Sequence, residues 1–513
     1  MALYLQGANK QTLLTEMNQI YAVTRYGGQT VIAIIGKDKV ETMKTDDFHK
    51  MFANILGEAS KKDNPVSISW FRWRGRRQYI GRGVVFEPGG PLEVPGDMLN
   101  LWRGFGVVPS AGDWPLMRAH ILNVVCSGNQ KHFDYLIQWM AYRVKHPDKP
   151  MGVAVAFLGA QGAGKGVVAR TFGRFFGNHF AHIAHGDQLT GRFNQHLVTA
   201  CVAFLDEALW AGDKKGEGVL KALITEPALQ LEAKFRDPIT VQNRLCIIVA
   251  SNNEWAVPTG IGDRRWFVLN VANTYAGMEH QSYWAALYQE VDNGGAAAML
   301  HDLLAMDLSK FNIRAVPHTK AKAQQQVHSL RGPMSWLYQV LQDGAISMSR
   351  WQATGLTISK DGAYDSYKEF TKERREYQPE IKSVWSKNVL KALGSLVKVT
   401  RPVVSGQRVR TFEFATLDNC RRRFEEHTGL QNLEWEETGD TPSGASIRQT
   451  GEIVQPAEPA PGSQPADPRE QKYDPDDDGP SEWEPSLDPD DEYRPEYDPV
   501  DDPKNWVPDG SLA

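Results

Sequence analysis

The chain has 513 residues, 41% of them hydrophobic and 15 of them Trp, which is enough for about three domains with buried cores. It contains no run of about 18 apolar residues and no visible secretion signal, so we expect a cytoplasmic protein that does not span a membrane. The four Cys lie far apart without a Cys-x-x-Cys pair, which favours buried thiols in a reducing compartment.

The formal charge of −5 is the sum of a basic part and an acidic part of the chain. From Gln431 to Ala513 there are 23 Asp and Glu against 5 Lys and Arg, so the preceding residues carry a formal charge of +13. A basic body suits contact with nucleic-acid phosphates, although many basic proteins bind no nucleic acid. The acidic, Pro-rich end at 435–513 is predicted to be disordered. It is either a solvated tail or a segment that docks a basic partner.

We expect residues 1–150 to form an N-terminal region of mixed structure that is partly aromatic and basic. Gln29–Ile35 reads as a strand and Thr45–Ile55 as a short helix. Ile68–Ile80 interleaves aromatic residues with Arg, which favours an edge hairpin with an aromatic inner face; a surface that stacks nucleic-acid bases is the alternative. Apolar residues recur at helical spacing in Lys131–Val144, which predicts a packed helix.

The apolar run Val153–Leu158 precedes a glycine-rich segment, Gly159–Gly166, which opens onto a predicted helix. A strand, a glycine-rich loop, a Lys and a helix in this order predict a phosphate-binding loop. Its glycines let backbone N–H groups turn towards an anion at the helix N-terminus. These glycines are Gly159, Gly162 and Gly164.

Lys165 is predicted to reach the β- and γ-phosphates of a bound nucleotide. Gly166 stands where Ser or Thr would normally hold Mg²⁺. The metal would then need another carboxylate or more water, so nucleotide binding is better supported than a particular metal geometry.

Leu197–Glu207 is predicted to be a second apolar strand, ending in Asp206 and Glu207. Asp206, at its tip, is predicted to hold Mg²⁺ directly or through water, and Glu207 to polarise the water that attacks the γ-phosphate. A third apolar strand, Leu245–Ala250, is followed by Asn252, which could orient that water or simply form a turn.

Arg264 and Arg265 come just before another predicted strand. A guanidinium is planar and always charged, so it suits stabilisation of a developing phosphoryl charge; a surface ion pair with Asp263 is the alternative. Lys234 and Arg236 lie near the tip of a predicted hairpin, where they are either solvated or contact DNA.

His179, His182 and His185 are spaced three residues apart. Zinc sites usually draw mixed ligands from two separate places, and no Cys or carboxylate partner is obvious nearby. A metal site at these residues is therefore the less favoured interpretation.

The order of these motifs resembles the superfamily-3 helicases, especially the helicase half of phage and poxvirus primase-helicases. The resemblance covers about residues 150–275 strongly and 60–150 weakly. It implies an AAA+ P-loop NTPase core with a mainly parallel sheet, which binds ATP and Mg²⁺ and assembles into a hexameric ring. By this resemblance Asn252 is the sensor, Lys234 contacts DNA, and Arg264 or Arg265 enters a neighbouring subunit's site.

Two departures from the family remain. Gly166 replaces the usual hydroxyl residue, and the region before the core is too short for a polymerase-type primase domain. Priming would then come from a separate primase or polymerase, or not be needed.

Helices followed by a basic hairpin are predicted within residues 333–434, a pattern that is typical of a winged helix. This part also resembles the C-terminal domain of the same primase-helicases. The wing would carry Arg401, Arg408 and Arg410 and would bind DNA or dock a protein. We therefore expect an ATPase core at 151–315 and a winged-helix-like domain at 316–434.

The function that the sequence favours is an ATP-dependent DNA helicase of a phage-like replication module in a bacterial host cell. Such a ring would translocate on single-stranded or forked DNA. A replication loader, whose ATPase drives assembly without unwinding, would use the same motifs. A small-molecule phosphotransferase is a further alternative, because Gly-Lys-Gly also resembles adenylate-kinase-type loops; there the hairpin, Asn252 and the paired arginines would have no obvious task.

Overall fold

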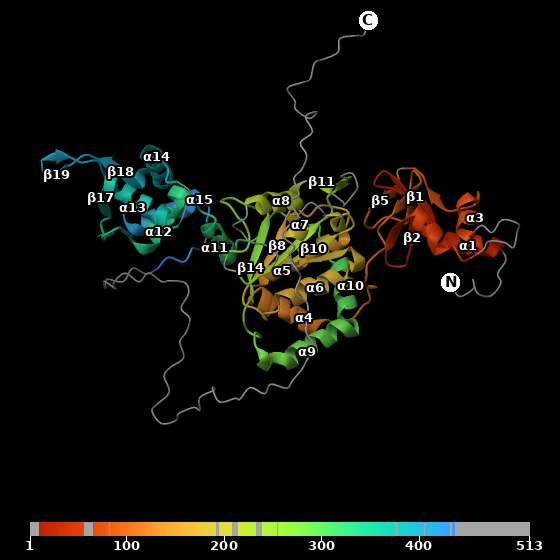
Figure 1. The fold of residues 1–513 in the computed structure, drawn as a ribbon. Helices are drawn as coiled ribbons and strands as arrows, with labels where there is room; N and C mark the ends of the chain where they lie inside the picture. The colour runs from red at the N-terminus through yellow and green to blue at the C-terminus, as the bar shows by residue number, and fades with distance from the viewer. Residues whose placement is uncertain are drawn as a thin grey trace, which may run out of the picture. The chain divides into compact units, whose positions relative to one another are not determined.

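The computed structural model describes residues 10–55, 65–81, 83–190, 194–207, 214–231, 239–253, 255–374, 378–404, 406–430 and 433–436. Nearly all of the acidic end predicted to be disordered lies outside these ranges. Figure 1 follows the described elements in chain order. None of the described helices is both long and apolar enough to cross a bilayer.

The N-terminal part contains a small mixed sheet with strand order β3-β2-β1-β4 and helices that pack on it. Its elements are α1 (Lys10–Ile20), β1 (Tyr21–Tyr26), β2 (Gln29–Ile35), β3 (Val40–Lys44), α2 (Thr45–Met51), α3 (Val66–Arg72) and β4 (Gln78–Tyr79). A second small sheet, of order β5-β7-β6, consists of β5 (Gly83–Val85), β6 (Glu93–Val94) and β7 (Met98–Asn100). The strand predicted at Gln29–Ile35 is confirmed.

The edge hairpin predicted at Ile68–Ile80 is wrong, because most of this stretch is α3 followed by a turn and the short β4. Val66 and Trp70 are one helical turn apart, and both are fully buried. The Trp70 ring contacts the ring of Phe48, with centroids 5.5 Å apart. Burial of this face in the local core outweighs the strand-like alternation of aromatic residues and arginines.

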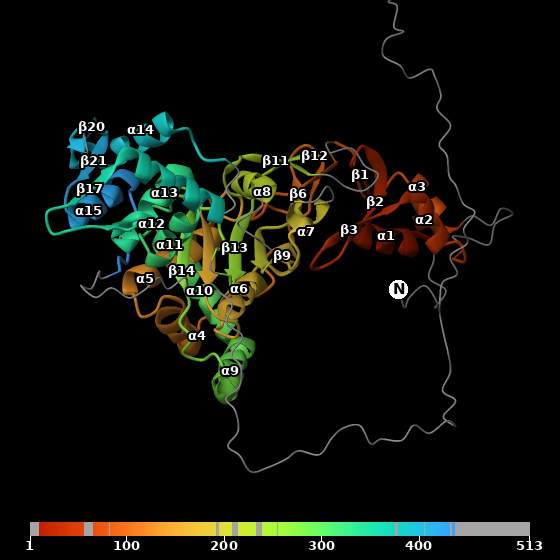
Figure 2. The same cartoon turned by 60° about the vertical axis from the view of Figure 1, so that its left-hand side comes forward.

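The central part is built on a parallel sheet with strand order β14-β8-β13-β10-β9. The strands are β8 (Ala154–Leu158), β9 (Phe180–Ile183), β10 (Val202–Asp206), β13 (Cys246–Ser251) and β14 (Trp266–Asn270). Alternate residues of β8, β10, β13 and β14 enter two separate hydrophobic clusters, one on each face of the sheet. This confirms the prediction of a mixed α/β fold with a parallel sheet, and Figure 2 shows strands of this sheet side by side.

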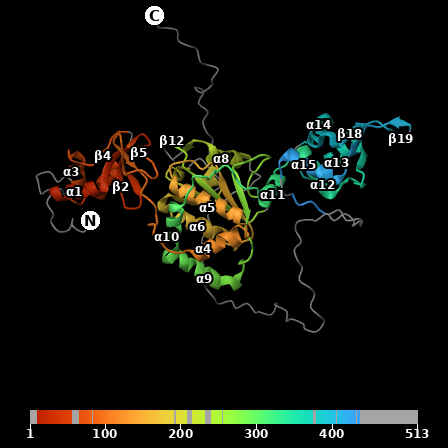
Figure 3. The ribbon, with the colours of Figure 1, turned by 180° about the vertical axis from the view of Figure 1, so that it is seen from behind.

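Helices cover both faces of the sheet. One face packs against α4 (Pro115–His120), α5 (Gln130–Lys145), α6 (Lys165–Arg174), α9 (Gln281–Glu290) and α10 (Ala296–Ala305), several of which are seen in Figure 3. The other face packs against α7 (Asp187–Thr190), α8 (Lys214–Thr225), the hairpin β11 (Ala228–Leu231)–β12 (Ile239–Gln242) and α11 (Lys320–His328). The helix predicted at Lys131–Val144 is therefore confirmed as part of the core of this sheet.

The C-terminal part has its own core around the buried rings of Trp336, Tyr367 and Trp385. Its elements are α12 (Gly332–Asp343), β15 (Ala345–Ile346), β16 (Ser349–Arg350), β17 (Leu356–Ser359), α13 (Lys360–Glu373), α14 (Lys382–Leu393), β18 (Val397–Thr400), β19 (Val403–Val404), β20 (Gln407–Arg408), β21 (Thr411–Phe414) and α15 (Leu417–Thr428). The sheet has the order β17-β21-β18, and β19 pairs with β20 in a short hairpin. The predicted pattern of helices followed by a basic hairpin is confirmed; the assignment as a winged helix stays a prediction.

Candidate functional site

The carboxyl ends of three neighbouring strands place the predicted polar clusters at one edge of the central sheet. In the register of the sheet, Leu158 pairs with Ser251 and Ala250 pairs with Asp206. After β8 the chain runs to β9, the strand at one edge of the sheet. After β13 it runs in the opposite direction, to β14 at the other edge. Such a reversal between neighbouring parallel strands is where open α/β sheets bind ligands.

Lys165 is the first residue of α6 and follows the glycine-rich loop that leaves β8. Its side chain is only 7% exposed, and its Nζ donates hydrogen bonds to the carbonyl oxygens of Gly159 and Ala160, the latter at 2.8 Å. Burial lowers the pKa of Lys165, an effect opposed by the negative charges of Glu207 and Asp206. The loop therefore holds an ammonium group that interacts electrostatically with two carboxylates across the same site.

The loop rests on an aromatic platform built from α4 and α9. Gly164 has a φ of +97°, and a Cβ added there would lie 2.6 Å from Nε2 of His120 and 2.7 Å from the ring of Trp284. His120 is fully buried; its Nδ1 shares a hydrogen bond of 2.8 Å with the hydroxyl of Tyr283, and burial lowers its pKa to about 4. Gly164 is thus required both by the backbone turn and by the close approach of neutral rings.

Asp206 ends β10 and carries two nitrogen partners on one carboxylate oxygen. Arg170 Nη1 donates to Oδ2 at 3.3 Å, and His182 Nε2 lies 3.2 Å from the same atom. Arg170 comes from α6 and His182 from β9, so three elements meet at this carboxylate.

Glu207 leaves the strand with a φ of +57°, which a residue other than Gly adopts only at a cost. Its N–H donates to the carbonyl of Ala250 on β13, at 2.9 Å, and this bond holds the residue at the strand tip. Glu207 is also one of the two acids that interact electrostatically with Lys165, as expected where local strain serves a site.

Lys165, Asp206 and Glu207 line a single cavity of about 640 Å³, within the range of small-molecule sites. The side chains and loop atoms that line it are those of Gln161, Gly162, Ala163, Gly164, Lys165, Gly166, Val167, Arg170, His182, Ala184, Asp206, Glu207, Trp284 and Tyr288. The cavity combines two cations, two carboxylates, the N-terminus of α6 and an aromatic wall. This chemistry fits a polyphosphate with an organic group attached.

Other residues predicted for the site lie elsewhere. Asn252 follows β13 at the same edge and is exposed, but it is not among the residues that line the cavity. Arg264 and Arg265 precede β14, and the Arg265 carbonyl accepts from the N–H of Ala154 at the start of β8. The length of β8 therefore separates the two arginines from their own loop, by roughly 15 Å at 3.3 Å per residue.

Arg265 also donates to Asp263, with Nη1 3.1 Å from Oδ2, whereas Arg264 is exposed. Lys234 and Arg236 lie outside the described residues, although the strands that flank them do pair as a hairpin. Over the part of the chain that the structure describes, no three His, Cys, Asp or Glu side chains gather as metal ligands. His182 instead contacts Asp206 from its place on β9.

Sequence reasoning did not find Arg170, His120, Trp284 or Tyr288 as part of the site. Arg170 was detectable in principle, because it follows Gly166 by one helical turn and therefore lies on the same face of α6. The aromatic platform had no local signal, since α4 and α9 reach the loop only through tertiary packing.

One match to a known protein family covers the part of the chain that contains Lys165, Asp206 and Glu207. Residues 157–265 match a family of unknown function (DUF5906). Over 257 residues the chain is 28% identical to the DNA primase-polymerase of Nitratiruptor phage NrS-1, and this match covers 48% of the chain and 34% of that protein. The match thus spans about a third of the length of the relative.

Two solved structures of that phage protein are similar in fold. The apo structure of the NrS-1 C-terminal region (305–718) aligns with a TM-score of 0.57 and 18% identity, over 79% of this chain and 98% of that one. An A-form apo structure of the same region aligns over the same shares with a TM-score of 0.55. At this identity the likeness establishes the fold alone.

Proposed function

We propose that the chain is an ATP-driven DNA helicase of a phage replication module, with a P-loop core of the AAA+ type that works as a ring, of hexameric size by the resemblance above. The observation that carries the proposal is the shared cavity of Lys165, Asp206 and Glu207 at the reversal point of the parallel sheet. Similarity to a phage DNA primase-polymerase supports a role in phage replication. The basic charge of the first 430 residues supports DNA as the partner.

The strand order supports hydrolysis of a triphosphate. β13 lies between β8 and β10, so the loop and the acids are two strand spacings apart, or about 10 Å. That gap accommodates a terminal phosphate and an attacking water. Asn252, which directly follows the intervening strand, would orient this water once the nucleotide is bound.

Each residue then has a task in phosphoryl transfer. Lys165 and the N–H groups of the loop bind the phosphates, and Glu207 accepts the proton of the attacking water. Asp206 and Glu207 offer carboxylate oxygens that suit a Mg²⁺ bound largely through water, which fits the absence of a hydroxyl at Gly166. Bound Mg²⁺ would neutralise charge on the phosphate oxygens.

Arg264 and Arg265 lie too far from their own loop to assist it, so they would act on the site of the next subunit. A ring whose subunits contact head to tail brings such a distant arginine to a neighbour's nucleotide. Lys234 and Arg236, on the hairpin, would contact the DNA strand.

The test is unwinding of a forked duplex by the full chain with ATP and Mg²⁺. We expect DNA-stimulated hydrolysis and strand separation, both lost in Lys165→Ala and retained in Lys131→Ala, an exposed lysine of α5. Glu207→Gln should bind ATP yet hydrolyse it at least about 100-fold more slowly, the usual size of a general-base effect. Hydrolysis without strand separation would favour the loader, and phosphate transfer to a nucleotide without DNA stimulation would favour the phosphotransferase.

A further inference from the structure

Gly166 and Arg170, one turn apart on α6, are packed against each other. A Cβ added at Gly166 would lie 2.6 Å from Nη2 of Arg170 and 2.8 Å from its Cζ. These distances are shorter than non-bonded carbon contacts allow, so no larger side chain fits at Gly166 while the guanidinium stays in place. A Ser or Thr at this position would therefore require the guanidinium of Arg170 to shift.

Arg170 also borders the cavity described above. Arg170 lines it together with Lys165, and its Nη1 donates to Asp206 at 3.3 Å. The Arg170 side chain is 48% exposed and that of Asp206 31%. Ion pairs with this much solvent contribute little to stability, whereas a glycine within a helix weakens it. Stability alone therefore does not explain the pairing of Gly166 with Arg170.

We propose that Arg170 is a second phosphate-binding cation of the nucleotide site, supplied by the same subunit, and that Gly166 is the residue that admits it. The proposal rests on the function proposed above. A guanidinium presents paired donors that match two phosphate oxygens, which an ammonium such as that of Lys165 cannot do. Asp206 holds this donor beside the first turn of α6, next to the N–H groups that cradle the phosphates.

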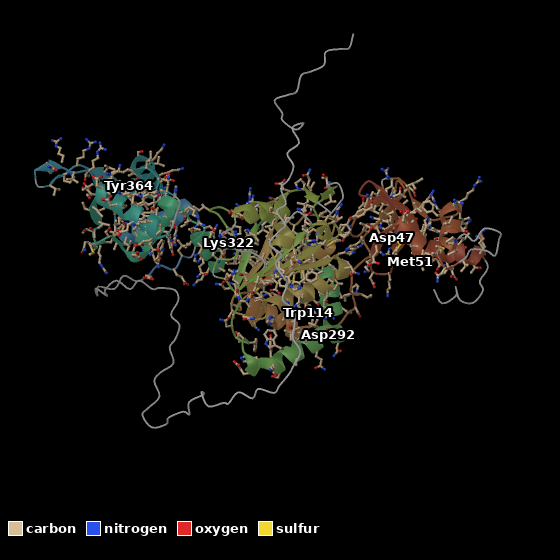
Figure 4. All side chains as sticks on the ribbon, viewed as in Figure 1. Asp47, Met51, Trp114, Asp292, Lys322 and Tyr364 are labelled. Atoms are coloured by element: carbon tan, nitrogen blue, oxygen red, sulfur yellow. The ribbon has the colours of Figure 1, made fainter. Side chains whose placement is uncertain are left out.

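The experiment is a double-mutant cycle read by direct binding rather than by activity. Dissociation constants for Mg·ATP and for inorganic tripolyphosphate are measured by calorimetry on the full-length wild type, Gly166→Ser, Arg170→Ala and the double variant. The matched control is Arg174→Ala, one turn further along α6, whose guanidinium pairs with Asp292 (labelled in Figure 4) at 2.6 Å. Thermal melting checks that each variant is folded.

We expect Arg170→Ala to weaken both ligands about tenfold or more, and by the same factor, because the contact is with phosphate. Gly166→Ser, which brings the loop closer to the usual motif, should weaken binding as well, because the added side chain displaces the guanidinium. The double variant should bind no more weakly than Arg170→Ala, and Arg170→Lys should recover only part of the affinity.

Wild-type affinity in Arg170→Ala, or a loss for ATP but not for tripolyphosphate, would overturn the inference. Fully additive losses in the double variant would also overturn it, because the two residues would then act independently. If the wild type bound neither ATP nor tripolyphosphate, both the proposed function and the inference about Arg170 would fail.

Discussion

Two glycines of the glycine-rich loop, Gly162 and Gly164, provide a test of how the loop is supported. Gly162 and Gly164 both have a positive φ, of +79° and +97°. A Cβ at Gly162 would meet nothing within 4 Å, whereas one at Gly164 would overlap the rings of His120 and Trp284. The substitutions Gly162→Ala and Gly164→Ala therefore share the backbone cost and differ in the packing cost.

The expected magnitudes follow from these two terms. A left-handed conformation costs an Ala roughly 1–2 kcal/mol in either variant. Gly164→Ala adds the cost of forcing a methyl group into a filled space, about 1–3 kcal/mol, because His120 is fully buried and cannot move aside. For a domain of about 200 residues, this difference corresponds to a melting temperature roughly 2–12 °C lower in Gly164→Ala than in Gly162→Ala.

The assay is hydrogen exchange of peptides from β8 and α6 along a thermal series, which reports on the central part of a chain with several cores. Replacing Trp284 by Ala should reduce the extra cost of Gly164→Ala, since one of the overlapping rings is then gone. Equal melting of the two glycine variants would refute the claim that the loop rests on the aromatic platform.

Three further predictions follow from other parts of the structure. Burial lowers the pKa of His120 from 6.5 to about 4, so as the pH falls through this range the unfolded chain binds a proton that the folded chain does not. The free energy of unfolding should therefore drop by roughly 3 kcal/mol between pH 6.5 and 4, and it should depend less on pH in His120→Gln. The four cysteines are buried, and burial raises their pKa values to about 11 or 12, so a thiol reagent should label them only at the rate of unfolding; fast labelling of native protein would contradict this. Mixing equal amounts of Lys165→Ala subunits and subunits that lack both Arg264 and Arg265 should restore hydrolysis at about a quarter of the interfaces of a ring, because half of the sites keep the lysine and half of their neighbours keep the arginines. No rescue at any ratio would argue for a site completed within one chain.

The elements that could be predicted from the sequence are those whose signal is local. The apolar runs of β8 and β13 are long enough to mark buried strands. β8 leads into the glycine-rich loop and β13 ends at Ser251, before Asn252, at the same edge of the sheet. The hairpin prediction for the stretch that contains Trp70 is wrong, because alternating aromatic residues and arginines resemble a strand, whereas the contact of Trp70 with the buried Tyr21 depends on tertiary packing. The partners His120 and Trp284 of Gly164 could not be predicted, because only tertiary packing brings them to the loop.

The account depends on a nucleoside triphosphate binding at the loop that carries Lys165. Calorimetric titration of Mg·ATP into the wild type, Lys165→Ala and Lys131→Ala measures this directly. We expect one nucleotide per subunit, a loss of about 10- to 150-fold in affinity in Lys165→Ala, as for a charged hydrogen bond worth roughly 1.5–3 kcal/mol, and no change in Lys131→Ala. Equal affinity of all three proteins, or no binding by any of them, would contradict the account.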